Sequence, residues 1–170
     1  FSSSKSQGKF YSRKGKESLE RSIKKLIMED GSFSQYSINY HRFLLDTLVQ
    51  VELWRRYIDL NYYFTDVFYS KCKNATIWLT KFVNEYSGQC PNIGGNDGGF
   101  CYQLHSLEYS NFKPSLQISC IVFLKKFIYD DGPWDEPLYW LDINKNLYPK
   151  MKMKKLTREI LPEGGYGIIK

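Results

Sequence analysis

Cysteine and histidine are the residue types in this chain that most often do chemistry, as nucleophiles, metal ligands or disulfides. The chain has 2 His and 4 Cys, which are Cys72, Cys90, Cys101 and Cys120. No Cys-x2-Cys or Cys-x4-Cys pair of a zinc site is present. His41 and His105 belong to no catalytic motif, and no serine lies in a nucleophile elbow. The sequence therefore predicts no catalytic, cofactor-binding or metal-binding residue, and a protein that is not an enzyme.

An even number of cysteines without metal-site spacing favours two disulfides, although four buried thiols in a reducing compartment have the same pattern. A helix expected over 75–87 separates Cys72 from Cys90 by roughly 20 Å, and bonded cysteines need Cα atoms within about 7 Å. A 72–90 disulfide is therefore excluded. Two pairings remain open, 90–101 with 72–120 or 72–101 with 90–120. The sequon Asn74-Ala75-Thr76 makes Asn74 a candidate for glycosylation.

Two further segments have the composition of ligand-binding loops. The glycines of 94–99 lack the Gly-Lys-Ser/Thr ending of a P-loop and the Gly-x-Gly-x-x-Gly order of a dinucleotide turn. Asp97 among them would also repel a phosphate, so we predict a flexible connector. The acidic residues of 130–136 do not have the spacing of an EF-hand loop, and we predict a solvated acidic turn.

Positive charge is concentrated at the two ends of the sequence, within a formal net charge of +6. Residues 1–16 contain 5 basic residues and no acid, residues 17–149 contain 13 basic and 16 acidic residues, and residues 150–170 contain 6 basic and 2 acidic residues. Basic segments of this kind can bind phosphates, anionic lipid surfaces or acidic proteins, and the alternative is solvated tails that only help solubility. We expect a protein partner, and predict that the basic ends are able to bind an anionic surface or a nucleic acid.

The residues that we expect to contact a partner lie towards the C-terminus. They are four cations on an expected helix over 150–160 and three aromatic residues in the segment before it, because aromatic side chains are enriched at protein interfaces. The predicted contact residues are Lys150, Lys154, Lys155, Arg158, Trp134, Tyr139 and Trp140.

Aromatic and basic residues also lie together in the run Trp54-Arg55-Arg56-Tyr57. Surfaces that stack on single-stranded nucleic acid have this composition. Helical periodicity, however, places Trp54 and Tyr57 in the core and the two arginines outside. We therefore predict core and surface residues here, and no nucleic-acid site.

Apolar periodicity predicts a mainly α protein, a compact helical bundle with a long central helix, a Gly-rich loop and an irregular aromatic C-terminal wrap. Residues 1–16 are expected to be a flexible basic segment, and 17–170 a single helical domain. The expected elements are helices over about 17–29, 35–69, 74–86, 102–109 and 116–128, the wrap over 133–149 and a basic helix over 150–160. A strand is the alternative for 116–128, because its middle is β-branched.

Composition and the first residues bear on the class of protein and its location. With 17% aromatic and 42% hydrophobic residues, a wholly disordered chain is excluded. The longest apolar stretch, 118–124, is much shorter than the roughly 20 residues of a membrane-spanning helix. The Ser- and Lys-rich, acid-free start at Phe1 is typical of what cleavage of a secretory signal or a mitochondrial presequence leaves. We expect a secreted protein, with a mitochondrial location as the alternative.

The cysteines and tyrosines have a repeated order. Each half of the set has the order Cys, Tyr, Cys, in Cys72…Tyr86…Cys90 and in Cys101-Tyr102…Tyr109…Cys120. This layout resembles the paired motif of the secreted bicycle salivary effectors of aphids. The resemblance covers 72–120 and implies a secreted, disulfide-linked, non-enzymatic effector that binds host macromolecules. The second hypothesis is an accessory structural subunit of a mitochondrial assembly, such as a respiratory complex or the ribosome.

Overall fold

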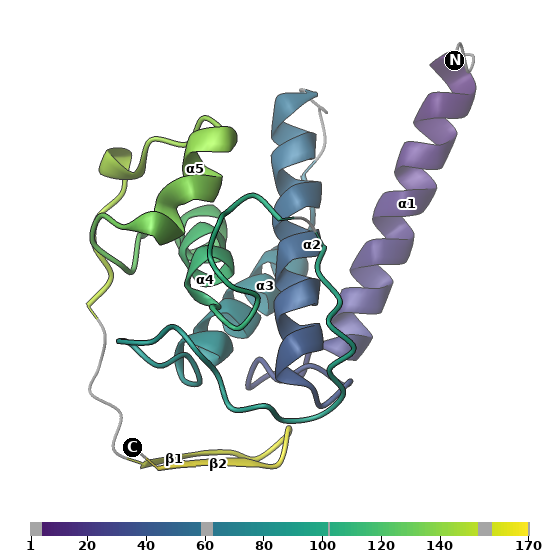
Figure 1. Ribbon diagram of the computed structural model, residues 1–170. Coiled ribbons are helices and arrows are strands. Elements are labelled where there is room, and N and C mark those ends of the chain that lie inside the picture. The colour runs from purple at the N-terminus through teal and green to yellow at the C-terminus, as the bar shows by residue number, and fades with distance from the viewer. Residues whose placement is uncertain (1–4, 59–62, 102, 153–157, 170) are drawn as a thin grey trace.

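The structure is a computed structural model that describes residues 5–58, 63–101, 103–152 and 158–169 (Figure 1). Its α-helices are α1 (Lys5–Leu26), α2 (Ile38–Tyr57), α3 (Asp66–Thr80), α4 (Lys113–Ser119) and α5 (Glu136–Trp140). A π-helical turn covers Cys120–Leu124, and 3-10 turns cover Pro133–Asp135 and Lys145–Leu147. Strands β1 (Arg158–Leu161) and β2 (Tyr166–Ile169) form an antiparallel hairpin. The predicted mainly α class is therefore confirmed.

Two helices replace the single helix expected over 35–69. Ser37 caps α2, because its Oγ accepts the N–H of Tyr40 at 3.1 Å, and α2 ends at Tyr57. Thr65 caps α3, so that the helix expected over 74–86 begins and ends earlier, at Thr80. Threonine is a favourable N-cap, and the aromatic residues just before it have weak helix propensity. The sequence therefore favours a break between the two helices.

The core lies between α2, α3 and α4. Its fully buried side chains come from one face of each helix and include Leu45, Leu48 and Val49 of α2, Ala75 and Leu79 of α3, and Leu116 of α4. Their spacing of three or four residues is that of an amphipathic helix. The π-helical turn extends α4 to Leu124, and Lys125, with a left-handed φ of 56°, ends it. Residues 113–124 are thus helical and not a strand.

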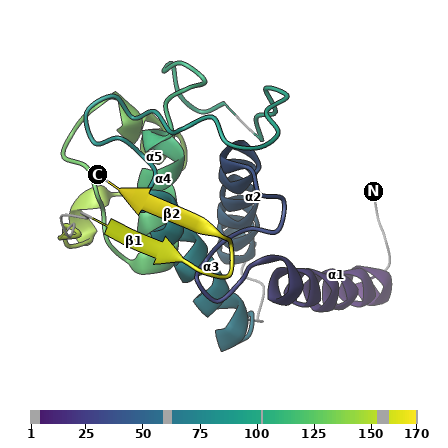
Figure 2. The ribbon, with the colours of Figure 1, turned by 90° about the horizontal axis from the view of Figure 1, so that it is seen from below.

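Helix α1 begins at Lys5, so that most of the segment 1–16, for which no regular structure is expected, is helical. Only its C-terminal half is anchored, since Ile23 is buried and Leu19 packs against the core. Phe10 and Tyr11 are exposed. Figures 1 and 2 show the N-terminal half of α1 standing away from the other helices.

The hairpin lies across the lower ends of the helices, as the view from below shows (Figure 2). Its inner side chains, Leu161 and Ile168, are buried. Tyr166 packs edge-on against Trp78 of α3, with ring centroids 5.2 Å apart. The helix expected over 150–160 is therefore wrong in the described residues, because 158–161 form a strand whose Leu161 packs over the core.

The turn of the hairpin is bound to the residues that follow α1. Asp30 accepts the backbone N–H groups of Glu163 and Gly164, both at 3.1 Å. The pKa of Asp30 is lowered, because hydrogen bonds to the carboxylate outweigh the opposing effect of burial. Segments 133 residues apart in the sequence are thus joined by hydrogen bonds.

The Gly-rich segment, expected to be a flexible connector, is fixed to the start of α2. Gly94 has a φ of +78°, and a Cβ there would lie 2.1 Å from the carbonyl oxygen of Tyr36, so only glycine fits. The N–H of Ile38 donates to Ile93, and the Oγ of Ser37 donates to Gly95. The helix expected over 102–109 is absent from the described residues 103–109.

Candidate partner-binding site

The two histidines lie in packed surroundings. His41 stacks on Trp78 with ring centroids 4.3 Å apart, and its Nε2 lies 2.9 Å from the carbonyl oxygen of Ala75. Burial lowers the pKa of His41 to about 4, and burial also lowers the pKa of His105. In the part of the chain that the structure describes, no three His, Cys, Asp or Glu side chains are grouped to hold a metal ion. Both histidine side chains are therefore packed among other residues of the fold.

The expected pair of disulfides is contradicted, because the four cysteines are unbonded. Cys72 on α3 and Cys120 in the π-helical turn are buried, and burial raises the pKa of both thiols. Cys101 packs against α2, with its Sγ 3.6 Å from the Oγ1 of Thr47. A buried thiol behaves as a small apolar side chain, so Cys72 and Cys120 contribute to the core without a covalent bond.

Asn74, the candidate glycosylation residue, lies inside α3. Its side-chain amide donates to the carbonyl oxygen of Glu29 at 2.9 Å. Thr76 of the same sequon is buried, and its hydroxyl donates to the carbonyl oxygen of Cys72 at 2.8 Å. The sequon therefore coincides with contacts that join α3 to the end of α1.

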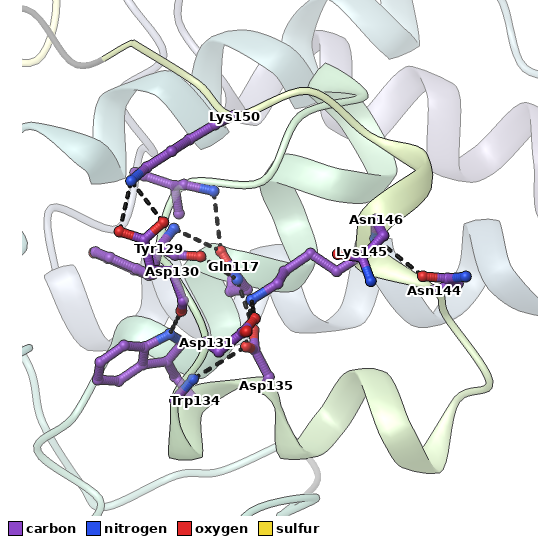
Figure 3. Close-up of polar contacts among 12 residues, drawn as sticks. Gln117, Tyr129, Asp130, Asp131, Trp134, Asp135, Asn144, Lys145, Asn146 and Lys150 are labelled. Carbon is purple, nitrogen blue, oxygen red and sulfur yellow. Dashed lines mark hydrogen bonds and ion pairs between the residues drawn. The ribbon is translucent and has the colours of Figure 1, made fainter.

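The aromatic wrap is organised around one buried amide, that of Gln117 on α4 (Figure 3). Its Oε1 accepts the backbone N–H groups of Ile128 and Tyr129, both at 3.0 Å. Its Nε2 donates to the carbonyl oxygen of Tyr129 at 3.1 Å and to Asp135 at 2.6 Å. The four hydrogen bonds of this side chain bind residues 128–129 and Asp135, so the segment that leads into the wrap and the start of the wrap are fixed to α4.

The acidic turn is bound by the protein's own lysines and is not simply solvated. Lys145 lies 2.7 Å from Asp131 and 2.6 Å from Asp135, and Lys150 lies 2.6 Å from Asp130 (Figure 3). Lys150, a predicted partner contact, thus has an acidic neighbour within the chain. Lys145 holds the pKa of Asp131 below its usual value through a hydrogen bond and its charge.

The three predicted aromatic contacts divide into one inner and two outer residues. Trp134 is half-buried, its Nε1 donates to the carbonyl oxygen of Asp130 at 2.9 Å, and the Nζ of Lys113 lies 4.1 Å from its ring centroid. Tyr139 and Trp140 are 79% and 62% exposed, and their rings meet edge-to-face with centroids 5.5 Å apart. We call Tyr139 and Trp140 the α5 aromatic pair.

Buried side chains and hydrogen bonds to Ser106 hold α5 in place. Its inner residues, Pro137 and Leu138, are buried. Glu136 accepts the backbone N–H of Ser106 at 2.7 Å and its hydroxyl at 3.0 Å. The α5 aromatic pair is therefore presented on a supported backbone, although both rings are largely in solvent.

The other predicted contact residues do not form the expected helical face. Lys154 and Lys155 lie outside the described residues. Arg158 is exposed at the start of β1, opposite Ile169 of β2. Lys150 is bound to the acidic turn, so the described cations of this group belong to two different elements.

A buried arginine holds the segment after the glycines against α2. The guanidinium of Arg42 donates to the carbonyl oxygen of Tyr109 at 2.5 Å and to Asn39 at 2.9 Å. Three aromatic rings, of Phe100, Tyr109 and Phe112, lie 4.2 to 4.6 Å from it. Burial lowers the pKa of Arg42.

A small cavity of about 10 Å³ lies between α2, α4 and the residues Phe100, Leu104 and His105, with Asp46 also in its lining. Burial raises the pKa of Asp46 to about 7, although a hydrogen bond with Ser115 and the charge of Arg42 oppose the shift. Asp46 therefore changes charge near neutral pH.

We expect Asp46→Asn to be progressively more stable than the wild type as pH rises. The folded pKa of Asp46 lies above its unfolded value of 3.8, so its stabilising contribution is complete below pH 4 and is lost as pH rises to 7. The difference in free energy of unfolding, variant minus wild type, should increase by about 2 kcal/mol between pH 5 and pH 7. Urea titrations at each pH measure this difference, and the effects of His41 and His105 cancel in it. A constant difference would contradict the shift.

The burial of three of the four residues 54–57 is opposite to that predicted. Trp54 and Tyr57 are 62% and 91% exposed and Arg55 is buried, whereas Arg56 is exposed as predicted. The pattern Glu52-x-x-Arg55-Arg56, in which one carboxylate reaches both arginines across a helical turn, was not considered in the prediction from apolar periodicity. Glu52 continues the buried face of α2, and Arg55 lies on that face with it.

Comparisons of the chain with models of protein families, with curated proteins and with solved structures found no match. Among the described residues, no helix combines the length and the apolar composition that crossing a membrane requires. Inference about function therefore starts from the surfaces described above.

Proposed function

We propose that this chain is a non-enzymatic interaction protein that binds a protein partner through the α5 aromatic pair. The observation that carries the proposal is the exposure of two large aromatic side chains, Tyr139 and Trp140, side by side on a supported turn. Tyr and Trp are enriched among the residues that dominate binding energy at interfaces. The buried surroundings of His41 and His105 support the non-enzymatic part.

The support of α5 matters for affinity. The hydrogen bonds of Gln117 to Asp135 and of Ser106 to Glu136 fix the residues just before the pair before any partner arrives. A preordered surface loses less conformational entropy on binding.

Two settings for such a protein follow from the sequence, a secreted effector and an accessory subunit of a mitochondrial assembly. The four unbonded thiols favour the second, because the first was expected to depend on disulfides. The binding surface that we propose is the same in both.

We expect the double variant Tyr139→Ser/Trp140→Ser to bind the partner at least about 30-fold more weakly than the wild type, because loss of a dominant contact costs about 2 kcal/mol or more. The partner is first isolated by affinity capture with the wild type and then titrated by biolayer interferometry. The matched control is Tyr86→Ser, which removes a ring that is 91% exposed elsewhere on the surface.

Circular dichroism should show both variants folded, since surface substitutions change stability by about 0.5 kcal/mol at most. Equal affinity of the double variant and the wild type would contradict the role of the pair. An enzymatic turnover that is lost on substitution of His41 or His105 would refute the non-enzymatic part.

A further inference from the structure

The C-terminal end of α2 presents aromatic rings to solvent. Trp54, Tyr57 and Tyr63 are 62%, 91% and 72% exposed. Two large rings of α2, those of Trp54 and Tyr57, are thus largely in solvent at the end of the helix.

Cations surround a single buried carboxylate at the same end of α2. Glu52, 2% exposed, accepts from Arg55 at 2.9 Å through two nitrogens and from Arg56 at 2.8 Å. Arg56 and Lys125 both donate to the carbonyl oxygen of Val122, at 3.4 and 3.0 Å, so their charges lie close together.

Positive charge exceeds negative charge there. Burial lowers the pKa of Lys125, and the charges of Arg56, Arg55 and Lys73 lower it further, against the one opposing charge of Glu52. Among these groups, four cations face one carboxylate. Glu20 of α1 accepts the backbone N–H of Thr65 at 2.7 Å, so this acid is engaged away from these cations.

We propose that the C-terminal end of α2 binds single-stranded nucleic acid, with bases stacked on Trp54 and Tyr57 and phosphates bound by Arg56, Lys73 and Lys125. Exposed rings beside uncompensated cations are the features that bind single strands without a fixed sequence. An acidic protein would need the cations but not the ring faces. Arg55, 4.6 Å from the ring of Tyr63 and bound to Glu52, holds that ring in place.

The test uses a fluorescein-labelled oligouridylate of about twelve nucleotides, titrated with the full chain and followed by fluorescence anisotropy at low salt. Tyr57→Leu should weaken binding at least about fivefold, because stacking on one base contributes about 1–3 kcal/mol. Tyr57→Phe keeps the ring and should bind like the wild type. The Tyr86→Leu variant, which loses an exposed ring elsewhere on the surface, should also bind this oligonucleotide as tightly as the wild type does.

Salt dependence tests the phosphate contacts. The double variant Lys73→Gln/Lys125→Gln should reduce the slope of log affinity against log salt by about 1.4, that is about 0.7 for each lost contact with a single strand. Lys24→Gln, an exposed lysine of α1, is the control. The Tyr139→Ser/Trp140→Ser variant should bind the oligonucleotide as tightly as the wild type does. A negative result for the nucleic-acid proposal would therefore leave the proposed protein-binding role of the α5 aromatic pair untouched.

Three results would overturn the proposal. The first is no binding at low salt, and the second is equal affinity of Tyr57→Leu and Tyr57→Phe in variants that circular dichroism shows to be folded. The third is competition by polyglutamate of equal charge that matches competition by unlabelled oligouridylate, which would indicate an acidic protein ligand.

Discussion

Arg42→Ala is expected to lower the free energy of unfolding by about 3–5 kcal/mol. Removing the guanidinium leaves the buried carbonyl oxygen of Tyr109 and the Oδ1 of Asn39 without this donor. It also empties the space among three aromatic rings. Chemical denaturation measures the loss, and hydrogen exchange should show faster exchange over 103–112 before global unfolding.

The control for Arg42 is Arg13→Ala, because the side chain of Arg13 is 69% exposed and its pair with Glu17 has a separation of 3.8 Å. We expect a change of at most about 0.5 kcal/mol there. Arg42→Lys keeps the charge but loses the planar stacking and the second hydrogen bond. Its stability should therefore lie between that of the wild type and that of Arg42→Ala. A loss below about 1 kcal/mol for Arg42→Ala would show that the segment is held by other contacts.

Trp78→Ala is expected to cost about 3–5 kcal/mol, the usual range for removing a large aromatic side chain from a core. Trp78 is 1% exposed and lies 4.3 Å from His41, 4.1 Å from Phe82 and 5.2 Å from Tyr166, measured between ring centroids. Its loss leaves a cavity between α2, α3 and the hairpin. Urea unfolding followed by far-UV circular dichroism measures the change.

The matched control is Trp54→Ala, which removes the same side chain from a position that is 62% exposed. We expect it to change stability by at most about 0.5 kcal/mol. The near-UV circular dichroism signal should lose intensity in Trp78→Ala but not in Trp54→Ala, because Trp78 is in a fixed environment. Equal effects of the two substitutions would contradict the core position of Trp78.

The helical class was predictable because the apolar residues of α2, α3 and α4 recur at helical spacing. The break after Tyr57 was not predicted, since it depends on the cap at Thr65 more than on periodicity. The strand at 158–161 was missed for a different reason. Its sequence suits a helix, but Leu161 and Ile168 fill the space over the core once the turn at 162–165 forms, and tertiary packing overrides propensity.

The candidate site was predicted in part. Aromatic content pointed to Tyr139 and Trp140, but no local pattern separates them from Trp134, which packs against Lys113 from another helix. A buried glutamine such as Gln117 has no signature in the sequence, because its burial follows from the segments it binds. The exposure of Trp54 and Tyr57 was predictable from Glu52, whose spacing to two arginines marks the inner face of α2.

The contact between Asp30 and the hairpin turn constrains the order in which the chain reaches its native state. Asp30 and Glu163 are 133 positions apart, and the whole intervening chain must leave the ribosome before these groups can meet. At the usual pace of about 5–20 residues per second, α1, α2 and α3 have several seconds together without the hairpin. During synthesis the Trp78 region therefore stays uncovered on the side that Tyr166 later occupies, and this nascent surface is the one that a chaperone would meet first.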